Sequence, residues 1–179
     1  IGIDFTPKMI KSAKKIAKQK KLNIDYRIGD ATKLRFSDKS FDSALFSNQG
    51  WTQIPGSEQR LKALKEVSRV LRKEGVYIFS IHKRKIIGKG SFYWLWKWIK
   101  FYIFKPLGIS IEEVDFGDRL FKRETSGLIA LDKQYIHIAS INEVKHLLKE
   151  TNFEVVYIGE GLSEHSGSRP TFFVCKKVQ

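Results

Sequence analysis

The sequence predicts an α/β fold in which helices pack against a mostly parallel sheet that ends in an antiparallel hairpin. Three observations lead to this prediction. Short apolar runs alternate with stretches of helical spacing in the first half of the chain, and these runs stop at polar side chains. The last two apolar runs are joined by a loop rich in Gly and Ser. With 179 residues and 42% hydrophobic content, the chain is expected to form one domain over residues 1–179.

The first strand is predicted at the start of the sequence and ends at Asp4. Thr6 and Pro7 supply an N-cap and a first helical residue, so a helix is expected from Pro7 to about Lys20. The lysines of this helix are interpreted as its solvated face. Asp4 would lie at the carboxyl end of the strand, where open α/β sheets bind ligands and an acid can accept both hydroxyl protons of a ribose.

Two further strands, at residues 22–28 and 43–46, also lead into polar residues. The residues at these two strand ends include Asp30, Ala31, Ser47, Asn48 and Gln49. Because the carboxyl ends of parallel strands meet at one edge of a sheet, these residues are expected on the same rim as Asp4.

A helix is then predicted from Glu58 to Leu71, with apolar residues on one stripe and Gly75 after its end. Residues 76–81 are nearly all apolar, which is typical of a parallel strand buried on both faces. His82 follows at the tip of this strand. An imidazole titrates in the range that suits a general base, and a solvated loop histidine is the alternative.

The alternation breaks between residues 83 and 140, which we interpret as an insertion. Residues 92–104 are apolar almost all round, and four interpretations suit them: core helix, dimer contact, lid over the substrate, or element in a membrane interface. We favour a lid or substrate-channel helix, because insertions after a strand lie close to the carboxyl edge of the sheet, where ligands bind and react. Residues 120–140 alternate in short runs, which predicts an antiparallel hairpin.

The last third of the chain returns to the earlier pattern. A helix is expected from Asn142 to Glu150, followed by strands at residues 153–158 and 171–177. A Gly/Ser-rich loop joins these strands, which predicts a hairpin at the edge of the sheet.

Composition limits the class of protein. The single cysteine, Cys175, excludes an intramolecular disulfide and any cysteine-cluster metal site, and is interpreted as a buried small hydrophobe. No signal segment is evident, and no apolar run is long enough to span a bilayer, so a cytoplasmic protein is expected, and membrane contact is the less favoured alternative. The formal charge of +14 would attract phosphates or nucleic acid, although a lysine-rich proteome would give the same charge. The oligomeric state is not predicted.

Four groups of residues in the first half resemble class I S-adenosylmethionine-dependent methyltransferases, in family order. They are Gly2-Ile-Asp4 with Met9-Ile10 and Ala13, Gly29-Asp30-Ala31 with Leu34 and Phe36, Ser40-Phe-Asp42, and Leu64-Lys-Glu-Val67 through Arg69-Val-Leu-Arg72 to Gly75. In the second half, Phe116-Gly-Asp118, Tyr135-Ile-His-Ile138 and Glu143-Val144 look like a subgroup of uncharacterised small methyltransferases. The resemblance implies a Rossmann-like methyltransferase sheet and S-adenosylmethionine as cofactor.

By position, the resemblance implies that Asp4 binds the ribose hydroxyls of the methyl donor, with Phe5 beside it. Asp30 would bind the adenine amino group, with the Ala31 backbone beside the ring. Ser47 and Asn48 would line the reacting centre. For the substrate pocket we expect the residues Gln49, Trp51, Tyr135 and His137, with Trp51 alternatively in the core and His137 alternatively a half-exposed strand residue. No metal site is expected.

The family's first strand and glycine-rich loop have no counterpart in this sequence. In this fold that strand lies in the middle of the sheet, and without it the buried edges would keep unpaired backbone groups. We therefore expect that residues 1–179 form a domain that is incomplete at its N-terminus.

The predicted function is methyl transfer to a small-molecule acceptor, by an in-line displacement in which the protein mainly aligns nucleophile and methyl group. One alternative is an RNA acceptor bound through the basic surface. Another is a non-catalytic Rossmann-like binding module or truncated paralogue. A nicotinamide cofactor is a further alternative, because Asp4 alone would also suit its ribose.

Overall fold

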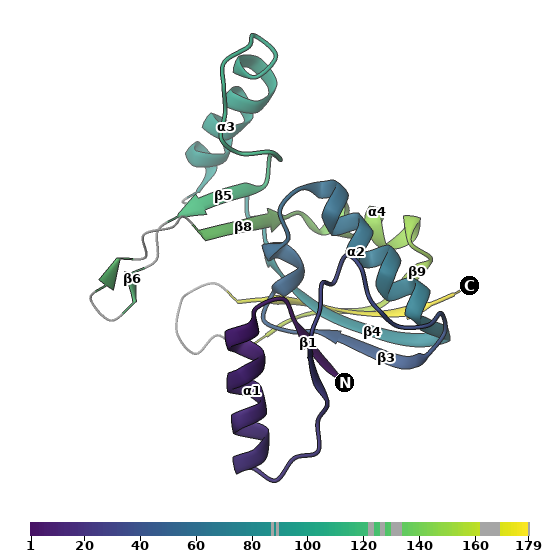
Figure 1. Cartoon of the computed structure of the whole chain (residues 1–179). Helices are drawn as coiled ribbons and strands as arrows, with labels where there is room; N and C mark the ends of the chain where they lie inside the picture. Colours follow the sequence, from purple (N-terminus) through teal and green to yellow (C-terminus); the bar gives the residue numbers. More distant parts are fainter. Residues whose placement is uncertain are drawn as a thin grey trace.

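The computed structural model describes residues 1–86, 88, 90–121, 124–125, 128–129, 134–161 and 169–178 (Figure 1). Its central feature is a six-stranded sheet built around the long strand β4 (Leu71–Lys83). On one side, β4 pairs antiparallel with β10 (Thr171–Lys177), which pairs in turn with β9 (Phe153–Glu160) at the edge. The predicted C-terminal hairpin is thereby confirmed.

Two strands share the other side of β4. The strand β3 (Phe41–Phe46) runs parallel to the first part of β4, and β8 (Gln134–Ala139) runs parallel to its last two residues. Next to β8 lies the antiparallel strand β5 (Asp118–Phe121), so the insertion extends the sheet beyond the tip of β4. This confirms antiparallel pairing within residues 120–140. The short strands β6 (Glu124–Thr125) and β7 (Leu128–Ile129) pair with each other.

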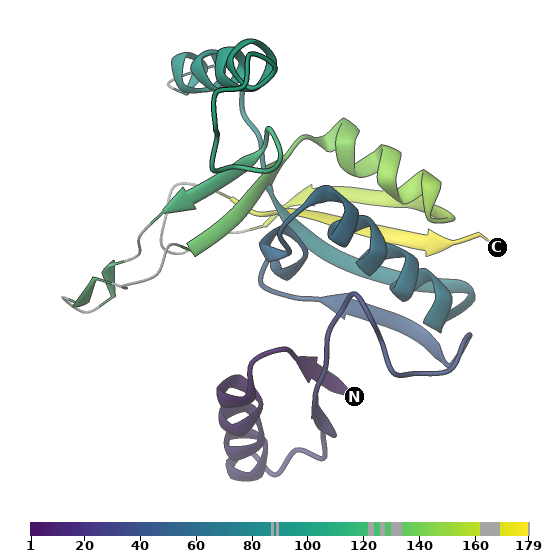
Figure 2. The same ribbon diagram turned by 45° about the horizontal axis from the view of Figure 1, so that its top comes forward.

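A separate two-stranded parallel sheet holds β1 (Gly2–Asp4) and β2 (Tyr26–Ile28), which are joined by α1 (Pro7–Gln19). Figure 2 shows this unit beside β3. Within the described residues, neither β1 nor β2 pairs with a strand of the larger sheet. The expectation of an incomplete domain stays a prediction.

The core lies between the large sheet and the helices α2 (Ser57–Val70) and α4 (Ile141–Glu150), which cover the same face (Figure 2). Aromatic side chains from β4 and β10 stack in it, with ring centroids 4.8 Å apart for Tyr77 and Phe79 and 5.3 Å apart for Phe79 and Phe173. Cys175 is buried beside them, as expected. The capping box of Ser140 and Glu143 starts α4.

The boundary between α2 and β4 differs from the prediction, because the helix ends at Val70 and the strand begins at once with Leu71. The backbone nitrogen of Ser40 donates to the carbonyl of Val70, and Leu71 then pairs with Phe41. Pairing with β3 therefore ends the helix at Val70, five residues before Gly75, the glycine that the sequence offers as a helix end.

The insertion also contains α3 (Ser91–Ile99), which continues as the π-helix η2 (Lys100–Phe104). The views in Figures 1 and 2 place α3 at the opposite end of the molecule from α1. The Gly/Ser-rich loop between β9 and β10 and part of the predicted 120–140 hairpin lie outside the described residues.

Candidate functional site

Parallel pairing of β1 and β2 brings the first two predicted acids to one strand edge. Asp4 is the register partner of Ile28, and its carbonyl accepts a hydrogen bond of 3.0 Å from the nitrogen of Gly29. Asp30 follows directly. The two carboxylates therefore lie at neighbouring strand ends, as the sequence predicts.

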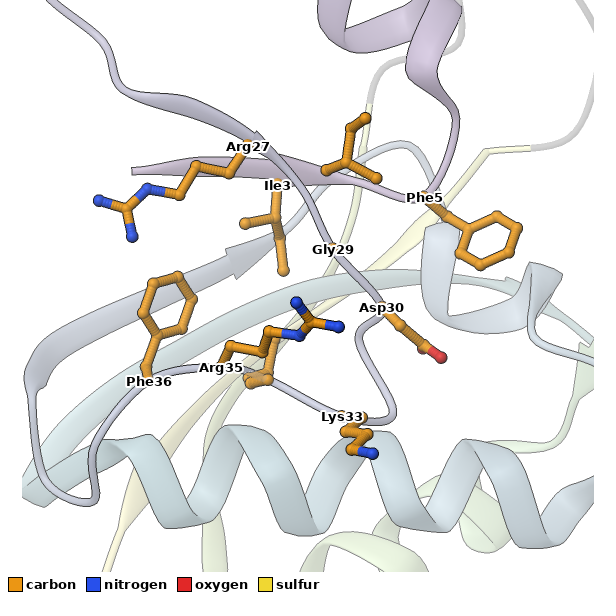
Figure 3. A pocket seen from close by; sticks show the side chains of 10 residues that line it. Ile3, Phe5, Arg27, Gly29, Asp30, Lys33, Arg35 and Phe36 are labelled. Carbon is orange, nitrogen blue, oxygen red and sulfur yellow. The ribbon is translucent and has the colours of Figure 1, made fainter.

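Beside this edge an open pocket of about 580 Å³ lies between the β1–β2 unit and the segment after β2 (Figure 3). Its lining residues are Ile3, Phe5, Arg27, Ile28, Gly29, Asp30, Lys33, Leu34, Arg35 and Phe36. Phe5 and Asp30 lie at one end of the pocket, and Arg27 and Phe36 lie at the other. The pocket thus combines an apolar interior, suited to a flat ring, with an acid at its rim.

Each acid uses one oxygen to shape its own turn. Oδ1 of Asp4 accepts a hydrogen bond of 2.7 Å from the nitrogen of Thr6, at the start of α1. Oδ1 of Asp30 accepts two bonds of 2.8 Å from the nitrogen and hydroxyl of Thr32. In the described part of the chain Oδ2 of each acid has no hydrogen-bond partner, so one oxygen per acid is available to a ligand.

The tip of β3 forms a tight turn of unusual backbone geometry. Asn48 and Gln49 adopt left-handed conformations, with φ of 53° and 51°, which costs energy for residues with side chains. The turn is held where the hydroxyl of Thr52 donates to the Gln49 carbonyl over 2.7 Å. Ser47 and Asn48 are exposed at this tip. Consecutive strained residues at a strand tip are typical of functional sites.

His82 is half-buried near the end of β4, one strand away from the tip of β3. Burial lowers the pKa of its imidazole below the ordinary value, which favours the neutral ring that can accept a proton. It does not line the pocket described above.

Trp51 lies in the core instead of a pocket wall. The short helix η1 (Gly50–Gln53) turns its indole inward, where it is 0% exposed and its Nε1 donates to the carbonyl of Arg60 over 3.1 Å. The ring also packs edge-on against Phe79. The sequence is compatible with Trp51 in a pocket wall or in the core, because an aromatic residue just after a strand tip can occupy either place. The conformation of η1 places it in the core.

His137 and Tyr135 also do not face a substrate pocket, because a polar network uses both of them. His137 is 1% exposed, with Nδ1 2.8 Å from Oδ1 of Asp118 and Nε2 2.6 Å from Oε1 of Glu143. The hydroxyl of Tyr135 donates to the same Asp118 oxygen over 2.6 Å. The expected pocket roles of Tyr135 and His137 are therefore replaced by structural ones.

Two arginines complete this network. The fully buried guanidinium of Arg60, on α2, donates to Oδ2 of Asp115 over 2.7 Å and to the Tyr135 hydroxyl over 2.8 Å. Arg84 donates to Oε2 of Glu143 over 2.8 Å and lies over the ring of Phe116, 4.9 Å from its centroid. These contacts join the insertion to α2 and α4. Sequence analysis missed both arginines, since their partners lie 55 to 75 positions away.

The network shifts the pKa values of its members in opposite directions. Burial raises the pKa of Asp118, but hydrogen bonds from His137, Tyr135 and the Asp115 backbone outweigh it and lower the pKa to about 2. Burial lowers the pKa of His137, but Asp118 and Glu143 outweigh it and raise the pKa. The ring therefore favours the doubly protonated form, in which each nitrogen donates to a carboxylate.

Asp115, Asp118 and His137 place ligand atoms within 4.8 Å of one another, a spacing that a metal ion could bridge. The guanidinium of Arg60 lies 2.7 Å from Asp115 and 4.0 Å from Asp118, and it supplies the positive charge at this position. We therefore assign this cluster as an ion-pair network instead of a metal site.

Residues 1–79 match the family described as a methyltransferase domain. The chain is also 29% identical, over 166 residues, to an uncharacterized protein of Methanocaldococcus jannaschii. This alignment covers 88% of the chain and 55% of that protein, so the chain spans about half the length of this curated relative.

Solved structures share the fold. A SAM-dependent methyltransferase from Methanosarcina mazei matches with a TM-score of 0.74 and 22% identity, over 99% of this chain and 81% of that one. The 1,6-didemethyltoxoflavin-N1-methyltransferase of Burkholderia thailandensis, solved with bound 1,6-didemethyltoxoflavin and S-adenosylhomocysteine, matches with a TM-score of 0.61 and 14% identity. This match covers 99% of this chain and 60% of that one.

The predicted Rossmann-like methyltransferase fold is confirmed by these structures. The match over residues 1–79 covers the strand-end acids Asp4 and Asp30, on which the resemblance to methyltransferases rests.

Proposed function

We propose that this protein transfers a methyl group from S-adenosylmethionine to a small-molecule acceptor by in-line displacement. The observation that carries the proposal is the placement of Asp4 and Asp30 at neighbouring strand ends, with Phe5 and Asp30 lining one pocket. The family match over the same residues and the shared fold support S-adenosylmethionine as the cofactor.

The cofactor site would use the free oxygens of the two acids. Oδ2 of Asp4 would accept hydrogen bonds from ribose hydroxyls, while its Oδ1 remains bonded to the nitrogen of Thr6. Asp30 would accept from the adenine amino group, with Phe5 and the Ala31 backbone flanking the ring. The apolar part of the pocket fits a flat purine, and burial of its surface would contribute much of the binding energy.

Ser47 and Asn48 would line the reacting centre, with Gln49 behind them. S-adenosylmethionine supplies the activated methyl group and its leaving group, so the protein mainly has to align the acceptor and exclude water. The strained turn at Asn48 and Gln49 fixes the backbone where this alignment is needed. His82 would accept a proton where the acceptor is a hydroxyl or a protonated amine.

A small-molecule acceptor is favoured by the Burkholderia thailandensis neighbour of the same fold, whose name and bound compound are those of a small-molecule methyltransferase. The insertion at residues 83–140 would form part of the acceptor side, through β8, which contacts η1 after the tip of β3. An RNA acceptor would instead depend on the basic surface, and its binding would fall steeply with added salt.

Titration calorimetry with S-adenosylhomocysteine tests the cofactor site. We expect Asp4→Asn and Asp30→Asn each to raise the Kd about tenfold or more, because each removes a charge-assisted hydrogen bond. Asparagine keeps an oxygen that can accept from Thr6 or Thr32, so the local turns are retained.

Asp42→Asn is the matched control, because Asp42 is an exposed acid on β3 that pairs with Arg72. Its Kd should equal that of the unaltered protein. Binding of S-adenosylhomocysteine that is equally tight in all four proteins would contradict the assignment of Asp4 and Asp30. Absence of binding in the unaltered full-length protein would favour a non-catalytic module.

A further inference from the structure

The helical segment of α3 and η2 buries Trp94 and Lys97 on its inner side and exposes large apolar side chains on its outer side. Lys97, in the middle of α3, is only 3% exposed, whereas Phe92 is 80% exposed. In a helix adapted to water the lysines lie in solvent and few large apolar side chains are exposed, so both exposures are unusual. The outer side is therefore suited to an environment other than water.

The inner side is fixed by specific contacts. The rings of Trp94 and Phe101 pack against Phe116, with centroids 5.7 Å and 6.0 Å apart. Nζ of Lys97 lies 3.4 Å from Oε1 of Glu113, and Arg84 lies over the rings of Trp94 and Phe116. These contacts hold the segment in one orientation against the rest of the insertion.

The outer side holds five residues that are 43% to 80% exposed, and we call it the outer face: Phe92, Leu95, Trp96, Trp98 and Ile103. It stands on a part of the molecule that projects away from the sheet and from α1 (Figures 1 and 2). A projecting face can enter a layer of lipid headgroups without collision of the rest of the protein.

Charge indicates which surface this face contacts. A second copy of the chain would bring another +14 charges and would be repelled, whereas an anionic lipid surface would attract the chain. Trp and Tyr prefer the boundary between headgroups and acyl chains, where their rings are half in water.

We propose that the outer face of α3 and η2 binds the interface of an anionic membrane, with its aromatic side chains among the headgroups. The chain would lie on the membrane and not cross it, and no helix among the described residues is long and apolar enough to span a bilayer. This proposal does not depend on the methyltransferase assignment.

Cosedimentation with lipid vesicles tests the proposal. The 179-residue chain should bind vesicles of phosphatidylcholine mixed with phosphatidylglycerol more tightly than vesicles of phosphatidylcholine alone. The double variant Phe92→Ser/Leu95→Ser should bind the anionic vesicles about tenfold more weakly or worse, because two apolar side chains no longer leave water.

The matched control is Val156→Ser/Tyr157→Ser on β9, where the side chains are similarly exposed, at 63% and 61%. Its vesicle binding should equal that of the unaltered chain. Circular dichroism and thermal unfolding establish that each variant keeps its fold. Equal binding by the Phe92/Leu95 variant and the unaltered chain would overturn the proposal.

Tryptophan fluorescence gives a second readout. Vesicles should shift the emission to shorter wavelength, and brominated lipids should quench it, through Trp96 and Trp98. Trp51 and Trp94 are buried and should not respond. The variant Trp96→Phe/Trp98→Phe should lose the response. A retained response would overturn the proposal, as would a dimer in light scattering that dissociates when Phe92 and Leu95 are replaced.

Discussion

Nε2 of His137 lies 2.6 Å from Oε1 of Glu143, and this contact joins the inserted strand β8 to the first turn of α4. The same glutamate closes the capping box of α4 and receives Arg84. One carboxylate therefore starts a helix and anchors the insertion. The aromatic helix α3 depends on this anchor, because Arg84 packs on Trp94.

Replacing His137 by leucine should lower the free energy of unfolding by about 3 to 5 kcal/mol, since it leaves the buried Asp118 and the partly buried Glu143 without their shared partner. Urea unfolding, followed by tryptophan fluorescence, measures the change. His146→Leu, at an exposed position of α4, is the control and should change stability little. A small effect of His137→Leu would contradict the structural role of the network.

The stability of the protein should depend on pH through this network. The pKa of His137 is higher in the folded protein than in the unfolded chain, so its contribution is complete below pH ~6.5 and is lost as pH rises through the folded value. The pKa values of Asp118 and Glu143 are lowered by folding, so their contributions are present above pH ~4.3 and are lost as pH falls. Stability should therefore be highest between about pH 5 and 6.5.

Urea unfolding over a pH series measures this profile. His137→Leu should lose the decline on the alkaline side, and His146→Leu should keep it. A profile in the unaltered protein that is flat above pH ~6.5 would show that the His137 ring is not held in its protonated form.

His82 should titrate below pH ~6.5, because burial lowers its pKa. Nuclear magnetic resonance of the imidazole protons, assigned with His82→Gln, measures this value directly. As the proposed general base, His82 should also contribute to the rate of methyl transfer. We expect His82→Gln to lower kcat about 100-fold and to leave the Kd for S-adenosylhomocysteine unchanged. An unchanged kcat would remove the assigned role.

The local elements could be predicted because their signals lie within a few residues. Helix α1 begins at Pro7 and β10 spans Thr171–Lys177, both as the sequence indicates. The acids at the ends of β1 and β2 could be placed together for a related reason, since parallel strands align their carboxyl ends.

The sequence by itself determined the strand and helix pattern, the strand-end acids and the family resemblance, because apolar periodicity and short motifs are local properties. Only the tertiary structure decided that Trp51 and His137 are buried, that Arg60 meets Asp115, and that Lys97 faces inward while Phe92 faces out. Burial and pairing of this kind depend on segments far apart in the chain. The identity of a single side chain does not indicate which distant segment will pack over it.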